Sequence, residues 1–198
     1  MWPVIFELSS TVLSVLFCSI AVKLTDDFLD HDLDARAGCS NLSAQLGSGA
    51  IIYGMLSLAL AASINANVSI PLFFASYSIG MFNDLKQSFP SGLSGLQESL
   101  LVFFLGVALW SWESMLFSTL FIFSIQLFDD YLDMHTDQLA GYRNLAHRIG
   151  KVECLLLSLL TLLSSWWVGE HLFFPVFTGT AIFYSGLLYF QRGKSSCC

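Results

Sequence analysis

The chain has 198 residues, of which 55% are hydrophobic and only 12% are charged, and its formal net charge is −7. Together with a mean hydropathy of +0.68, this composition excludes an ordinary soluble domain and favours a protein that resides in a bilayer. The five cysteines form no CxxC pair and have no matching histidines, which argues against a zinc site or a disulfide framework.

Seven apolar runs follow one another along the chain, and most approach the ~20 residues that a spanning helix needs. They cover residues 2–22, 46–64, 70–82, 100–110, 115–127, 152–168 and 172–190. The runs lack the two-residue alternation of a membrane barrel. The sequence therefore predicts an all-α, polytopic membrane bundle of about seven transmembrane helices, forming a single domain over residues 1–198 with pseudo-repeats at about 1–85 and 96–190.

The basic residues set the expected orientation. If seven helices cross in order, every lysine and arginine falls on the same side of the membrane: Lys23, Arg36, Lys86, Arg143, Arg148, Lys151, Arg192 and Lys194. Loops rich in these residues stay in the cytoplasm. The predicted protein is therefore a multi-pass membrane protein with its N-terminus outside and its C-terminus inside. The first run lacks a basic flank, so it is interpreted as a retained helix rather than a signal peptide.

An acidic segment occurs twice, and we call its two copies the cassettes. Residues 24–47 read LTDDFLDHDLDARAGCSNLSAQLG, and residues 127–150 read LFDDYLDMHTDQLAGYRNLAHRIG, with 11 of 24 positions identical at a spacing of 103. The acids at matched positions are Asp26/Asp129, Asp27/Asp130, Asp30/Asp133 and Asp34/Asp137. The seven-helix topology places both cassettes on the cytoplasmic side.

The spacing of these acids indicates a metal site. Positions i, i+3 and i+7 share a helix face, so Asp27, Asp30 and Asp34 would form one carboxylate stripe, and the second cassette would form another. Unpaired carboxylates repel one another, and Mg²⁺ takes oxygen ligands that it shares with substrate phosphate. Solvated surface acids are the competing interpretation, although two matched sets disfavour it. A calcium loop is a weaker alternative, because neither copy has the DxDxDG spacing.

Both cassettes resemble the motifs of the UbiA superfamily of intramembrane prenyltransferases, which carry N-D-x-x-D-x-x-x-D in each half. The second copy reads DDYLDMHTD and then GYRNLA, and the chain also holds a Tyr77-Ser78…Leu85-Lys86 segment similar to one between the family's halves. The resemblance implies Mg²⁺ as cofactor. It implies catalytic and metal-binding roles for Asp27, Asp30, Asp34, Asp130, Asp133 and Asp137, a metal contact for Asp26, and diphosphate contacts for Lys86, Arg143, Asn144 and Arg36.

The implied activity is ionisation of an isoprenyl diphosphate and transfer of the prenyl group to a lipophilic acceptor. A terpene cyclase of the same superfamily is the alternative, since the metal chemistry is shared. A non-catalytic lipid-binding subunit is a third hypothesis. Family members usually have nine helices and a basic segment after the first motif, both missing here, so a partner subunit or homo-oligomer could close the cavity. Nothing in the chain predicts nucleic acid binding. Cys197 and Cys198 are interpreted as an unordered tail, with lipid attachment as the alternative.

Overall fold

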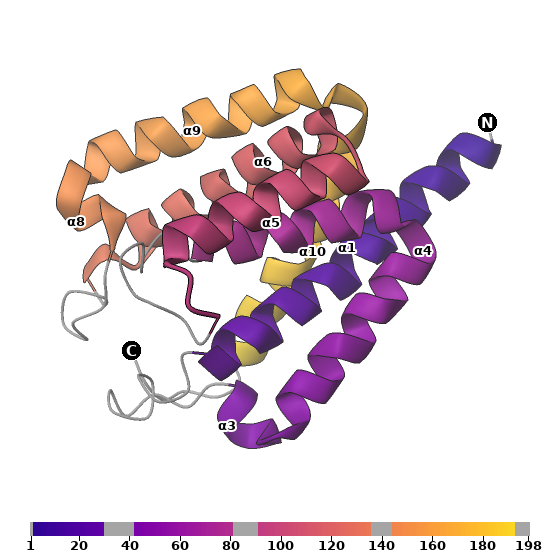
Figure 1. The fold of residues 1–198 in the computed structure, drawn as a ribbon, viewed down its shortest axis with the longest axis horizontal. Helices are drawn as coiled ribbons and strands as arrows, with labels where there is room; N and C mark the ends of the chain where they lie inside the picture. Colours follow the sequence, from indigo (N-terminus) through magenta and orange to yellow (C-terminus); the bar gives the residue numbers. More distant parts are fainter. Residues whose placement is uncertain (1, 30–41, 81–90, 136–143, 193–198) are drawn as a thin grey trace. The chain divides into compact units, whose positions relative to one another are not determined.

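The computed structural model describes residues 2–29, 42–80, 91–135 and 144–192, and Figure 1 shows their helices in sequence colours. Over these ranges the chain is helical and contains no strand, so the prediction of an all-α chain is confirmed for them. The helices are α1 (Trp2–Leu29), α3 (Leu42–Leu46), α4 (Gly49–Gly80), α5 (Gly95–Leu109), α6 (Trp112–Leu132), α8 (Leu145–Ile149), α9 (Lys151–Val168) and α10 (Glu170–Arg192).

Five helices are long and apolar enough to cross a membrane, namely α1, α4, α6, α9 and α10. Helix α5 is apolar but shorter, with 15 residues. The set fits a multi-span integral membrane protein but does not fix the predicted count of about seven. The difference lies in α5 and in α4, which holds the second and third apolar runs in one element of 32 residues. A straight helix of that length would measure about 48 Å, beyond the ~30 Å hydrocarbon core.

Helix α4 is kinked rather than straight, because its backbone leaves helical geometry at Asn65 (φ −154°, ψ 86°). Hydroxyls on α1 satisfy the groups that this break opens. Ser14 Oγ donates to the carbonyls of Ala61 at 2.8 Å and Asn65 at 3.2 Å, and Asn65 Nδ2 donates to Thr11 Oγ1 at 3.1 Å. Broken helices are tolerated at membrane depth where neighbouring side chains supply such partners. The kink also falls between the second and third predicted apolar runs.

The described helices belong to two compact units. The first contains α1, α3, α4 as far as Ile70 and α10 from Leu172 onward, and the second contains the rest of α4 with α5, α6, α8 and α9. In the first unit, a Cβ added to Gly179 on α10 would lie 2.9 Å from Val15 Cβ on α1, so these helices approach closely. In the second unit, α6 and α9 pack side by side.

Helices α1 and α6 bury the same positions of the sequence repeat. Six pairs of residues, each 103 positions apart, are buried in both helices: Ser14/Phe117, Val15/Ser118, Cys18/Phe121, Ala21/Ser124, Leu24/Leu127 and Asp27/Asp130. Only the last two pairs have the same residue type. The shared pattern therefore reflects a common way of packing rather than common side chains, and it extends the repeat well beyond the cassettes.

The repeat continues into the helices that follow, at a spacing of 104. The pairs buried in both copies are Ala50/Cys154, Gly54/Ser158, Ala61/Ser165, Pro71/Pro175, Leu72/Val176 and Ala75/Gly179. At the same spacing the kink at Asn65 corresponds to Gly169, where α9 ends and α10 begins. Each copy thus runs through a long helix, a short helix, a second long helix, a break and a third helix.

Candidate functional site

Both cassettes begin within the last six described residues of a long helix. Helix α1 is described as far as Leu29, and α6 ends at Leu132 with Asp133 as its C-cap residue (φ −93°, ψ 8°). The predicted carboxylate stripe therefore does not continue along α6 beyond this point. The first two acids of the stripe predicted for the second cassette also differ in exposure. Asp130 is 8% exposed, whereas Asp133 is exposed.

In the first cassette, the adjacent acids Asp26 and Asp27 lie in different surroundings. The Asp26 side chain is 61% exposed and that of Asp27 only 8%. Lys23, on the preceding turn, places its Nζ 3.0 Å from Asp27 Oδ1 and 3.6 Å from Asp26 Oδ2. One lysine thus compensates both carboxylates, in the i,i+3 and i,i+4 geometry of neighbouring helix positions.

The second cassette divides its acid pair in the same way, with Asp129 exposed and Asp130 buried. Asp130 Oδ2 accepts the backbone N–H of Leu145 at 3.0 Å, and Asn144 Nδ2 donates to the Asp130 carbonyl at 2.8 Å. Gln126 Nε2 donates to Asp130 Oδ1 at 3.5 Å. Gln126 occupies the repeat position of Lys23, so both buried aspartates have a partner four residues earlier.

Asn144 begins the short helix α8. Its Oδ1 accepts the backbone N–H of Ala146 at 2.8 Å, which is the hydrogen bond of an N-cap residue. Asn144 is 4% exposed. Since Nδ2 already donates to Asp130, the amide group uses both its donor and its acceptor inside the protein. This residue was predicted to contact diphosphate.

Each cassette finishes with a short helix, α3 or α8, that ends at a glycine. The Gly47 N–H donates to the Ser43 carbonyl at 2.8 Å, and the Gly150 N–H donates to the Ala146 carbonyl at 3.0 Å. Both glycines have positive φ, 54° and 105°. This conformation is common where helices end and is easiest for glycine. Helices α3 and α8 are therefore repeated structural elements, which apolar periodicity did not reveal.

A polar cluster joins the end of α4 to the start of α5. Tyr77 Oη donates to Glu98 Oε2 at 2.6 Å, and the Ser91 hydroxyl donates to the other oxygen of this carboxylate. These bonds, that from Ser91 first, hold the pKa of Glu98 below its ordinary value. Nearby, Ser99 Oγ donates to the Ser78 carbonyl at 2.9 Å. The cluster fixes both ends of the segment that carries Lys86.

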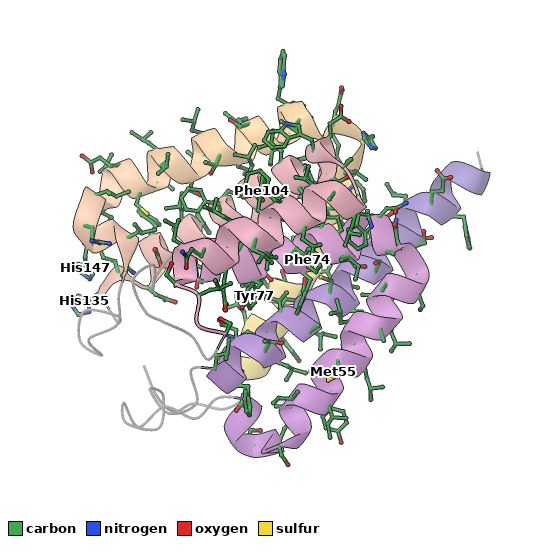
Figure 2. The ribbon with its side chains drawn as sticks, viewed as in Figure 1. Met55, Phe74, Tyr77, Phe104, His135 and His147 are labelled. Carbon is green, nitrogen blue, oxygen red and sulfur yellow. The ribbon has the colours of Figure 1, made fainter. Side chains whose placement is uncertain are left out.

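Basic and aromatic groups surround the end of the second cassette. Figure 2 draws His135 and His147 near the end of α6 and at α8, and His147 Nε2 donates to the Met134 carbonyl at 2.7 Å. Lys151 Nζ lies 5.0 Å from the centre of the Tyr131 ring, a cation–π contact. Lys151, the first residue of α9, thus contacts the aromatic residue that directly follows Asp130.

The predicted site is described only in part. Six of its residues lie outside the described ranges: Asp30, Asp34, Arg36, Lys86, Asp137 and Arg143. Within the described ranges, no group of three or more histidine, cysteine, aspartate or glutamate side chains is placed to hold a metal ion. The structure thus positions Asp26, Asp27, Asp129, Asp130, Asp133 and Asn144 and identifies Lys23 and Gln126 as partners that sequence reasoning had not assigned to the site.

Comparison with known protein families, curated proteins and solved structures gives no match for this chain.

Proposed function

We propose that this chain is a Mg²⁺-dependent intramembrane prenyltransferase of the UbiA type. It ionises an isoprenyl diphosphate and transfers the prenyl group to a lipophilic acceptor. The observation that carries this proposal is the placement of an acid pair at matching repeat positions, in the last described turn of α1 and the last turn of α6. Neither last turn contains a basic residue. A helix C-terminus bears partial negative charge, so carboxylates there are favoured by a nearby cation, and a bound Mg²⁺ would add to the compensation that Lys23 gives the first pair.

The exposed acids suit a magnesium ion. Asp26, Asp129 and Asp133 present carboxylate oxygens, which are the ligands that Mg²⁺ prefers. With Asp30 and Asp34 in the first cassette and Asp137 in the second, each cassette offers several carboxylates. Mg²⁺ usually takes only one or two of them and keeps its other positions for water and substrate phosphate. When bound, Mg²⁺ would stabilise the charge that develops on the departing diphosphate.

The remaining chemistry belongs to the chain. Arg36, Lys86 and Arg143 contact the diphosphate oxygens. The allylic C–O bond breaks, and its electron pair leaves with diphosphate. A new bond then forms between the prenyl carbon and the acceptor, which loses a proton. The apolar helices accommodate the hydrocarbon chain and exclude water from the cation.

The membrane topology completes the proposal. Both cassettes face the cytoplasm, the N-terminus lies outside and the C-terminus inside. This holds when α4 crosses twice, once on each side of Asn65. The kink and the 32-residue length of α4 support two crossings.

An assay without acceptor tests the function first. Purified protein in detergent is incubated with Mg²⁺ and prenyl diphosphates of ten to twenty carbons, and diphosphate release and organic products are followed. Turnover that requires a quinone, phenol or lipid acceptor supports the transferase. Cyclic hydrocarbons formed without acceptor would instead establish a terpene cyclase, and absence of turnover with any acceptor would favour a non-catalytic lipid-binding subunit.

A further inference from the structure

The end of α6 and the start of α8 are joined by a pair of residues that we call the clip, Asp130 and Asn144. The clip consists of two hydrogen bonds in opposite directions. The Asp130 carboxylate accepts the Leu145 N–H at 3.0 Å, and the Asn144 amide donates to the Asp130 carbonyl at 2.8 Å. In the sequence, the other acids of this cassette, Asp133 and Asp137, lie between the two clip residues.

The surroundings of Asp130 differ from those expected of a metal ligand. Asp130 is 8% exposed, and its two carboxylate oxygens accept hydrogen bonds, one from the Leu145 N–H and the other from Gln126 Nε2. A ligand to Mg²⁺ must turn an oxygen toward an ion that is also reached by water and phosphate. Asp129 and Asp133 on either side are exposed and meet that condition.

The negative charge of Asp130 strengthens its hydrogen bond to the start of α8. Leu145 is the first residue of α8, and its N–H is among those that the helix itself leaves without a partner. A carboxylate is a stronger acceptor for such a group than a neutral side chain. The Asn144 cap then satisfies the next such group, at Ala146, with a 2.8 Å hydrogen bond.

We infer that Asp130 is a positioning residue, which acts through α8, rather than a ligand to the metal. This inference rests on the proposed function and changes the role that the resemblance gives to Asp130. The clip joins the end of α6 to the start of α8, and Mg²⁺ binding belongs to the exposed acids. Asn144 likewise positions α8 instead of contacting diphosphate.

Three variants separate a positioning role from a ligand role. Asp130→Asn keeps an oxygen that can accept the Leu145 N–H, whereas Asp130→Ala removes it. Asp133→Asn removes the charge of an exposed acid that is proposed to bind metal. Glu113→Gln, an exposed acid on the first turn of α6, is the matched control.

The first measurement is amide hydrogen exchange over residues 145–150 of the full-length protein in detergent. Asp130→Ala should accelerate exchange there about tenfold or more, the effect of losing one hydrogen bond to a charged group. Asp130→Asn keeps a neutral, weaker acceptor and should fall between wild type and Asp130→Ala. Glu113→Gln should stay within about threefold of wild type. Unchanged exchange in Asp130→Ala would overturn the inference, whether or not the protein is an enzyme.

The second measurement is binding of Mn²⁺, used as a spectroscopic probe for Mg²⁺, to the same variants. Asp130→Asn should bind with wild-type affinity, and Asp133→Asn should bind at least about tenfold more weakly. Equal losses in Asp130→Asn and Asp133→Asn would make Asp130 a ligand and overturn the inference. Failure of the wild-type protein to bind Mn²⁺ would instead overturn the proposed function, and the exchange measurement would still decide the role of the clip.

Discussion

Gly169 lies directly against the ring of Phe117. A Cβ built on Gly169 would stand 2.4 Å from Phe117 Cδ2, far inside van der Waals contact, and Phe117 is 1% exposed. Because the ring is enclosed, it has little room to yield. The junction of α9 and α10 can therefore approach α6 only if residue 169 has no side chain.

This contact makes Gly169→Ala a destabilising change. Overpacking a close-packed interior typically costs about 1–3 kcal/mol, so the variant should unfold at a lower temperature in detergent micelles. The control is Gly186→Ala on α10, where an added Cβ meets nothing within 4 Å. That variant should match wild type or gain up to about 1 kcal/mol from helix propensity. Equal stability of the two variants would show that Phe117 moves aside.

A second prediction concerns the packing of α6 on α9. Ser158 Oγ donates to the Ser124 carbonyl at 2.9 Å, and both residues are buried. Interhelical hydrogen bonds in membrane proteins contribute about 0.6 kcal/mol on average. Ser158→Ala should therefore lower the free energy of unfolding by about that amount. Ser164→Ala is the matched control, because the exposed Ser164 hydroxyl donates within its own helix, to Leu160. Thermal unfolding of both variants in the same detergent measures the difference.

The apolar runs predicted most of the helices but not the form of α4. Four predicted runs correspond to single long helices, α1, α6, α9 and α10. The apolar runs at residues 46–64 and 70–82 were predicted as two separate helices, yet both lie in α4, which departs from helical geometry only at Asn65. Hydroxyls contributed by α1 satisfy that break, and such tertiary contacts leave no trace in local periodicity.

The short helices at the ends of the cassettes, α3 and α8, were not predicted. Five residues are too few for a periodic apolar pattern or for independent stability. Their signal was a pair of end markers, Asn144 and Gly150 in the second copy, with Asn41 and Gly47 at the same spacing in the first. A capping residue followed by a glycine defines both ends of a short helix.

The sequence also could not show which acid of each pair is buried and which is exposed. Asp129 and Asp130 are chemically identical neighbours, and it is the position of α8 that gives Asp130 the Leu145 N–H as a partner. Position i−4 carried a clue, because Lys23 and Gln126 can both donate to an acid one turn later. The metal chemistry predicted for the cassettes remains a prediction that the described residues do not test.

The topology of α4 leads to a third prediction. With two crossings, the exposed residues Ser48 and Arg148 lie inside and Glu113 lies outside. All five tryptophans, Trp2, Trp110, Trp112, Trp166 and Trp167, would then belong to the outer side. With one crossing, the last four would instead lie inside, opposite Trp2, and the basic residues would be divided between the two sides. Tryptophan favours membrane interfaces, and basic residues favour the cytoplasm.

Single-cysteine variants at these three positions test that topology. The native cysteines are first replaced by serine, and intact cells are treated with a membrane-impermeant maleimide. Two crossings predict that Glu113→Cys is labelled, while Ser48→Cys and Arg148→Cys react only after lysis. Labelling of Arg148→Cys with protection of Glu113→Cys would mean that α4 crosses once and that the cassettes face opposite sides.

The proposed metal chemistry predicts that both cassettes are needed for turnover. Asp30→Ala and Asp133→Ala should each lower the rate by at least about a hundredfold, because loss of one charged ligand removes several kcal/mol of stabilisation from the departing diphosphate. Both variants should still insert into the membrane, which fractionation checks. Chelation of Mg²⁺ should stop wild-type turnover, and added Mg²⁺ should restore it. If either variant keeps wild-type activity, its cassette does not bind the catalytic metal, and a mechanism with metal ions in both cassettes is excluded.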